Sequence, residues 1–153
     1  LIEQGCDVLA QQTDSSAPVI AAEERGVWTV GYNSDMRAEA PTKMLTSPVW
    51  DWGFYYKEVV GKILEDSYRH GNYWEGLASG IVLLTPLSDK VPEETRQIVH
   101  DYETRLFAGT FHPFQGPLYD QANRLRIPAE RVMTDAELLS MDWFVDNVIM
   151  AVP

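Results

Sequence analysis

Short apolar runs and helical patterns alternate along the first third of the chain. Residues 7–11 and 28–32 are apolar without a strict two-residue alternation, which is typical of strands buried in a parallel sheet. Between them, residues 17–25 predict a helix with a proline in its first turn and a glycine after its end. A strand, a helix and a second strand within about 30 residues match the size of one strand–helix–strand unit. Residues 43–47 predict a third strand.

The most regular helical pattern covers residues 52–69, and its apolar residues recur at the spacing of one helix face. They are Tyr56, Val59, Val60, Ile63, Leu64 and Tyr68. Residues 80–84 predict another buried strand, and residues 92–107 predict a second amphipathic helix. Strands that alternate with helices indicate an α/β fold, with a mostly parallel sheet and flanking helices.

The two ends of the chain have less regular patterns. Residues 110–133 are rich in proline and glycine, which predicts a loop with short strands and a hairpin around residues 120–123. Residues 134–137 have the spacing of a capping box before a short helix. The tail, residues 143–152, is apolar and predicted to be buried. Residues 1–5 resemble the last turn of a helix closed by a glycine, which indicates a piece of a longer protein.

Composition and charge narrow the function classes. The chain has 153 residues, 45% of them hydrophobic, as expected of one globular domain. Its net charge is -11 and its basic residues are scattered singly, so we expect no nucleic-acid partner. One cysteine excludes an internal disulfide and a multi-cysteine metal site, and the three histidines lack ligand spacing. The sequence therefore predicts no metal and no cofactor.

Three polar loops follow the predicted strands, at residues 12–16, 33–35 and 48–52. In open α/β sheets, ligands bind at the loops that follow the carboxyl ends of strands. Carboxylates, amides, hydroxyls and indoles together suit a planar small molecule that forms hydrogen bonds, because rings stack on tryptophan while polar groups contact the edges. The alternative for each residue alone is a helix cap, a turn or a place in the core.

A hydrolase is the enzyme alternative, with Asp14 and His112 beside a serine nucleophile at Ser15 or Ser16. The chain has no Gly-x-Ser-x-Gly elbow and no glycine-rich phosphate loop. No set of nucleophile, base and orienting group assembles at the predicted strand ends. We therefore expect a protein that is not an enzyme.

Several segments, in order and at matching spacings, resemble the C-terminal half of the basic membrane protein family. These are the substrate-binding lipoproteins of ABC importers, which have a type I periplasmic-binding fold. The matching segments are residues 5–11 (GCDVLAQ), 31–36 (GYNSDM), 46–47 (TS), 52–56 (WGFYY), 109–117 (GTFHPFQGP) and 138–143 (LLSMDW).

The resemblance implies a two-lobed protein whose N-terminal lobe is missing from this chain. Residues 1–48 and 86–153 are then the C-terminal lobe, and residues 49–85 cross into the other lobe. It further implies an ABC permease as partner, lobe closure on a ligand, and a place in the periplasm or on the outer face of the membrane. A lipid anchor would lie in the missing N-terminus. The sensor half of a transcription regulator with the same fold is a further alternative.

The resemblance also implies a ligand class, because family members bind nucleosides or purine-like bases between the lobes. Asn33 stands where the family has a ribose-contacting Asp, and Trp50 falls at about the position of a Lys. The loss of both charges favours a bare planar base over a nucleoside. The predicted ligand-binding residues are Gln12, Thr13, Asp14, Asn33, Asp35, Trp50 and Trp52.

Overall fold

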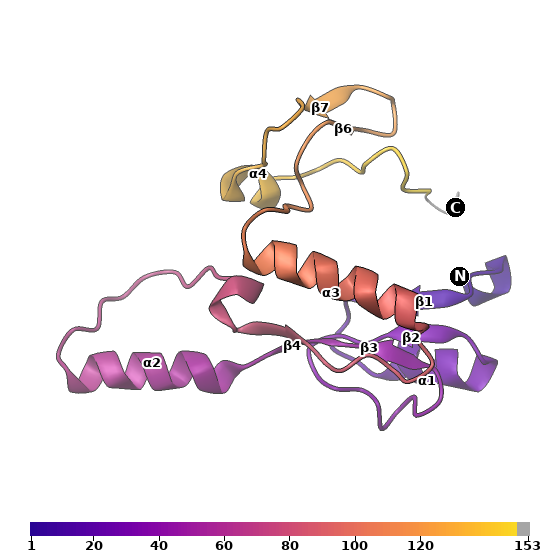
Figure 1. Ribbon diagram of the computed structural model, residues 1–153, viewed down its shortest axis with the longest axis horizontal. Helices are drawn as coiled ribbons and strands as arrows, with labels where there is room; N and C mark the ends of the chain where they lie inside the picture. The colour runs from indigo at the N-terminus through magenta and orange to yellow at the C-terminus, as the bar shows by residue number, and fades with distance from the viewer. Residues whose placement is uncertain (150–153) are drawn as a thin grey trace. The chain divides into compact units, whose positions relative to one another are not determined.

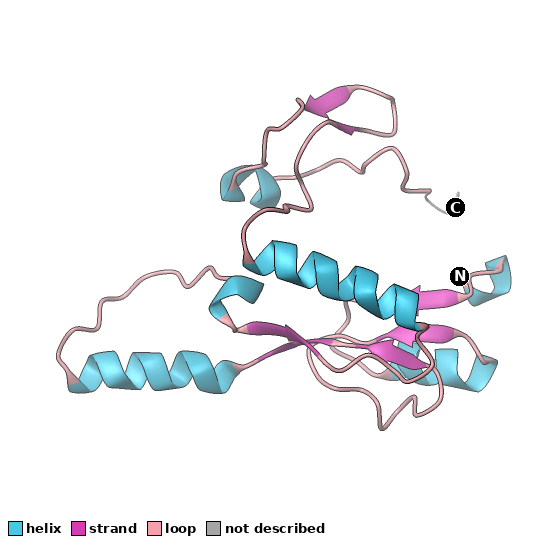
Figure 2. Ribbon diagram, in the orientation of Figure 1, coloured by secondary structure: helices cyan, strands magenta, loops and turns pink. Residues whose placement is uncertain are grey.

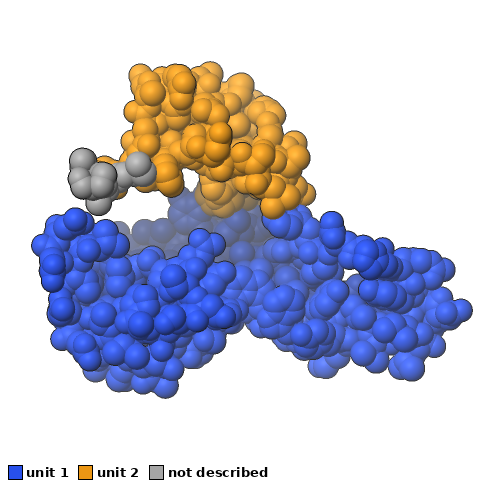
Figure 3. Space-filling view, turned by 180° about the vertical axis from the view of Figure 1, so that it is seen from behind, with its two compact units in different colours: residues 1–107 blue, residues 108–153 orange. Residues whose placement is uncertain are grey.

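The computed structural model describes residues 1–149, and the chain divides into two compact units, Leu1–Phe107 and Ala108–Pro153 (Figure 3). Among the described residues, no helix has both the length and the apolar character needed to cross a membrane. Each unit is described below by itself.

The first unit is built on a parallel sheet of three strands (Figure 1). Strands β1 (Val8–Ala10), β2 (Trp28–Val30) and β3 (Met44–Thr46) lie in that order, and both pairs are parallel. Helix α1 (Ala17–Arg25) joins β1 to β2 and packs on both. The three predicted strands, their parallel direction and the connecting helix are confirmed.

A small apolar core lies beneath this sheet. Val19 of α1, Met36, Ala40 and Met44 of β3 form one buried cluster. The hydroxyl of Thr29, which is fully buried, donates to the carbonyl oxygen of Leu9 at 2.9 Å. This bond satisfies a polar group that would otherwise be costly to bury, and it ties β2 to β1.

An antiparallel pair follows the parallel sheet. Strand β4 (Pro48–Trp50) pairs with β5 (Val82–Leu84), so the prediction of a loop over residues 48–52 is wrong for its first three residues. A strand of three residues that begins with proline has no recognisable local pattern. Its pairing partner lies far along the chain, so no local signal reveals the pairing either. The pair brings together the two ends of the segment that leaves and re-enters the rest of the first unit.

Helix α2 (Trp52–Leu64) follows β4 (Figure 2). It is five residues shorter than predicted. Asp51 caps its first turn by accepting from the N–H of Phe54 at 3.2 Å. After Leu64 the chain turns back, because Asp66 adopts a positive φ of 55° and the N–H groups of Ser67 and Tyr68 both donate to the carbonyl of Lys62.

Helix α3 (Glu93–Phe107) confirms the second predicted amphipathic helix. The guanidinium of Arg96 on α3 donates to the carbonyl oxygens of Val91 at 3.0 Å, Leu87 and Ser88. The segment between β5 and α3 is therefore fixed to the first turn of the helix. A 3₁₀ turn, Leu77–Ser79, contacts both α3 and β5.

The second unit contains the predicted hairpin and capped helix. Strands β6 (Leu118–Tyr119) and β7 (Leu125–Ile127) are antiparallel, and α4 (Asp135–Leu139) begins at a capping box between Thr134 and Glu137. Both predictions are confirmed. The tail is not buried as predicted where it is described, since Phe144 is 52% and Ile149 is 95% exposed. Residues 150–152 of that prediction lie outside the described residues.

Candidate functional site

The loops after β1 and β2 meet at the carboxyl edge of the parallel sheet. The Asn33 Nδ2 donates to the Asp14 Oδ1 at 2.9 Å, and both side chains are exposed. Asn33 has a positive φ of 67°, a conformation that asparagine tolerates better than most residues, and it forms a bridge with Val49 of β4. Three segments that are distant in sequence therefore bring two predicted site residues into direct contact.

Trp50 follows Val49 at the end of β4. Its ring and that of Tyr32 are 5.2 Å apart between centroids and nearly perpendicular, with an interplanar angle of 79°. Edge-to-face pairs of this kind favour a fixed orientation of both rings. Tyr32 was not predicted as a site residue, although it adjoins Asn33 in the sequence.

Gly31 lets β2 approach the residue that precedes β4. A Cβ at Gly31 would collide with the Oγ of Ser47, a fully buried residue whose N–H donates to the Thr85 Oγ1 at 2.9 Å. The hydroxyl of Thr46 donates to the carbonyl oxygen of Thr85 at 2.7 Å. These bonds join the start of β4 and the end of β5 to the edge of the parallel sheet.

The remaining predicted residues lie around this edge. Thr13 donates to the side chain of Gln11 at 3.1 Å, and Gln12 is exposed. Asp35 faces Arg37, with 3.4 Å between the carboxylate Oδ1 and the Arg37 Nε, and accepts from the Arg37 N–H. Asp35 is therefore engaged within its own turn, which is the turn role that its residue type also allowed.

A cavity of about 320 Å³ opens where β4 enters α2. Its walls are predominantly aromatic, and it includes both predicted tryptophans. The lining residues are Trp50, Trp52, Tyr55, Tyr73, Trp74, Glu75 and Ile81. The rings of Tyr55 and Tyr73 are 4.5 Å apart. The residues from 73 to 75 were missed by sequence reasoning, although the density of aromatic residues over 50–56 and 73–74 is a signal that the sequence carries.

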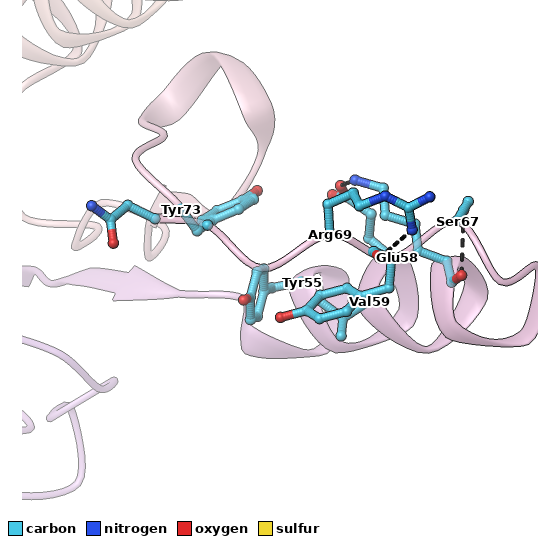
Figure 4. Close-up of a pocket in the computed structure, with 10 residues that line it drawn as sticks. Tyr55, Glu58, Val59, Ser67, Arg69 and Tyr73 are labelled. Carbon is cyan, nitrogen blue, oxygen red and sulfur yellow. Dashed lines mark hydrogen bonds and ion pairs between the residues drawn. The ribbon is translucent and has the colours of Figure 1, made fainter.

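A second cavity, of about 350 Å³, lies between α2 and the segment that returns from it (Figure 4). Tyr55 and Tyr73 also border this cavity. Lys62 pairs with Glu58, which raises the pKa of the lysine, and Arg69 donates to the carbonyl oxygen of Tyr68 at 2.7 Å. The charged groups are occupied by local partners, and none of the three predicted loops reaches this cavity.

The residues of the hydrolase alternative belong to different compact units. Asp14 accepts a hydrogen bond from Asn33, whereas His112 is exposed and belongs to the second compact unit. Within residues 1–149, no three His, Cys, Asp or Glu side chains converge in an arrangement that could hold a metal ion.

Comparison with known proteins adds a family. Residues 1–106 match the family Bmp, described as ABC transporter substrate-binding protein PnrA-like. A purine-binding protein of Brucella abortus is 33% identical over 148 residues, which are 97% of this chain and 42% of that protein. A proposed ABC transporter glucose-binding protein of Haloferax volcanii is 33% identical over 120 residues, which are 78% of this chain and 31% of that protein.

Two solved structures are similar to the chain in fold. A transcriptional activator of the comK gene from Bacillus halodurans superposes with a TM-score of 0.65 at 25% identity, over 73% of this chain and 40% of that one. A solute-binding protein of an ABC transporter system from Conexibacter woesei gives a TM-score of 0.55 at 22% identity, over 72% and 38%. The predicted fold class is confirmed. The chain spans less than half the length of each of these four relatives.

Proposed function

We propose that this chain, which belongs to the Bmp family of PnrA-like ABC transporter substrate-binding proteins, forms one part of an importer's substrate-binding component and takes a purine-type base. The family match over residues 1–106 carries the substrate-binding role. The purine ligand is supported by the relative from Brucella abortus, which is named for purine binding and aligns with 97% of this chain.

The loops at the carboxyl edge of the parallel sheet supply the groups that such a base needs. A purine ring would stack on Trp50, whose orientation is supported by Tyr32 at 5.2 Å. The bonded pair of Asp14 and Asn33 offers acceptor oxygens beside it. Gln12, Thr13, Asp35 and Trp52 form the rim of the proposed site. Because Asn33 and Trp50 replace the charged sugar contacts that the resemblance implies, the site favours a base over its nucleoside.

The binding step is a closure of two lobes around the ligand. In this proposal, residues 1–48 and 86–153 belong to one lobe, and residues 49–85 cross into the other. The crossings are the antiparallel strands β4 and β5, which are joined to the sheet through Thr46, Ser47 and Thr85. A ligand that contacts both lobes stabilises the closed state and shifts the population toward it.

The exposed face of α2 supports a partner lobe outside this chain. Helix α2 has no buried residue, and Tyr56, Val60, Ile63 and Leu64 are 53–81% exposed. An apolar helix face of this kind is normally covered. We assign its cover to the part of the same protein that the longer relatives possess and this chain lacks, in keeping with the 42% of the Brucella abortus protein that it spans.

The remaining features of the proposal follow from the family. The closed protein would deliver its ligand to an ABC permease, and it would act in the periplasm or on the outer face of the membrane, held by a lipid anchor upstream of Leu1. A binding protein needs no catalytic group, so we assign it no enzyme activity. The family match favours this role over the hydrolase and the transcription-regulator alternatives.

A thermal-shift panel on the full-length protein tests the proposal. A ligand that binds the native state raises the melting temperature by an amount that grows with the logarithm of its concentration relative to its Kd. Purine bases are expected to raise it, while glucose and an ester substrate leave it unchanged. Stabilisation by glucose without any effect of purines would contradict the ligand class, and hydrolysis that is lost in His112→Ala would contradict the role.

A further inference from the structure

The cavity at the start of α2 combines aromatic walls with one carboxylate. Five of its lining residues are aromatic, and among the described lining residues Glu75 carries the only formal charge. The cavity volume of about 320 Å³ falls at the lower end of the range typical of small-molecule sites. It shares Trp50 and Trp52 with the proposed base site, and Glu75 lines the same cavity as these two rings.

The chemistry of Glu75 selects one kind of ring edge. An ionised carboxylate only accepts hydrogen bonds, and its two oxygens match a pair of adjacent N–H donors. A carbonyl oxygen at the same place would face the negative charge of the carboxylate without a proton between them, which is unfavourable.

We propose that Glu75 determines the specificity of the proposed purine site, by pairing with a base edge that carries two adjacent N–H donors, as the N1–H and 2-amino group of guanine do. This inference rests on the proposed function, because it places a purine-type base against Trp50. It adds the residue that distinguishes among purines, the edge of the base that this residue contacts, and the base that it favours.

Three 6-oxopurines that differ in the group at position 2 test this inference. Hypoxanthine has a hydrogen there, guanine an amino group, and xanthine an oxygen together with a proton on N3. Each is titrated into the full-length protein and followed by tryptophan fluorescence. Guanine is expected to bind on the order of tenfold more tightly than hypoxanthine, as one hydrogen bond to a charged group allows, and xanthine is expected to bind most weakly.

Variants at Glu75 locate the preference. Glu75→Gln is expected to weaken guanine more than hypoxanthine, and so to bring the guanine-to-hypoxanthine affinity ratio close to one. Glu75→Asp keeps the charge but withdraws it by one methylene, and is expected to weaken the preference without abolishing it. Glu94→Gln removes an exposed carboxylate of α3 and serves as the control for net charge. It is expected to leave the ratio unchanged.

The outcomes separate the inference from the function on which it rests. If hypoxanthine binds but guanine binds no more tightly, the inference is wrong and the proposed function stands. If none of the three bases binds, the proposed function itself fails. If Glu75→Gln weakens all three bases equally and also lowers the denaturant midpoint, Glu75 supports packing and the inference is overturned. Should that variant fail to fold, an unchanged ratio in Glu75→Asp overturns it.

Discussion

At the scale of single residues, the edge of the parallel sheet depends on the absence of a side chain at Gly31. Residue 31 is buried and faces Ser47, whose backbone pairs with Thr85. A larger residue here would push β2 away from Ser47 and the start of β4. The position of Asn33 relative to Trp50 would then change.

Substitution of Gly31 by Ala is expected to destabilise the chain by about 1–3 kcal/mol, the usual cost of overpacking a buried position. Ser47→Ala removes the Oγ that the new Cβ would strike, so the double variant should recover part of the loss. Denaturant unfolding of the two single variants and the double variant measures the coupling. Strictly additive effects would contradict the proposed steric contact.

Truncation of Trp50 tests the stacking role of its ring. In the full-length protein, Trp50→Ala is expected to weaken base binding by about 1–3 kcal/mol, the range for base–aromatic stacking. Its effect on stability should be smaller than the roughly 3–5 kcal/mol expected when a core tryptophan is removed, because Trp50 is half-buried.

Trp143 is the matched control for this comparison. Its ring packs under the guanidinium of Arg126, 4.9 Å from the ring centroid, in the second unit. Trp143→Ala should lower the denaturant midpoint and leave base affinity unchanged. If Trp50→Ala instead unfolds the protein while the folded fraction keeps its affinity, Trp50 is a core residue and the stacking account is wrong.

Asp120 gives the second unit a dependence on acid. Asp120 is 3% exposed. Its carboxylate accepts hydrogen bonds from the side chains of Arg124 and Arg126 and from the backbone N–H groups of Ala122 and Arg124. These bonds, led by the Arg124 side chain, lower the pKa of Asp120 from 3.8 to about 2. A lowered pKa in the folded state stabilises the fold above the unfolded value and loses that effect as the pH falls through the folded value.

The hairpin should therefore lose stability between about pH 4 and pH 2. Urea unfolding at a series of pH values, followed by Trp143 fluorescence, measures this loss. Asp120→Asn should be less stable at neutral pH and should show a flatter dependence over that interval. An equal slope in both proteins would show that another group is responsible.

At the scale of elements, the sequence predicted those helices and turns that are determined by residues within or next to the element itself. Helix α1 has the predicted bounds because proline begins it and Gly26, with a φ of 71°, ends it. The capped α4 and the hairpin around Asp120 follow from turn and cap chemistry in the same way. Strand β4 was missed because it exists only through its pairing with β5, which no local pattern reveals.

Helix α2 shows the opposite error. Its apolar pattern continues to Tyr68, but the helix ends at Leu64, and Tyr68 lies in the returning segment that borders the larger cavity. One side of α2 is lined by that segment, whereas Tyr56, Val60 and Ile63 remain exposed. The regular apolar pattern therefore marks a face of α2 that needs a covering partner. In our proposal that partner is a lobe outside this chain.

Ile63→Glu tests that assignment. Residue 63 is 56% exposed in this chain, so the substitution should leave the stability of the isolated chain nearly unchanged. In the full-length protein it would bury a charge at the lobe contact and should lower the melting temperature. Lys57→Glu, at an exposed position of the same helix, controls for helix charge. Equal effects of Ile63→Glu in both proteins would contradict the docking of α2 on the missing lobe.

At the scale of the whole molecule, the sequence predicted the family and the fold class but not the full site. Ordered motifs over residues 5–143 were sufficient for the family, and the match over residues 1–106 confirms it. The aromatic cavity was not predicted, because Tyr73 and Glu75 reach Trp50 only after the chain turns back beyond α2. In our proposal the site lies between two lobes, so it also takes residues from a lobe outside this chain.

The central claim is that the protein binds a purine-type base, with Asn33 and Trp50 in place of charged sugar contacts. Isothermal titration calorimetry of the full-length protein, with hypoxanthine and its nucleoside inosine under identical conditions, tests it most directly. The account predicts that the base binds more tightly than the nucleoside. Binding of inosine tens-fold tighter than hypoxanthine would contradict it.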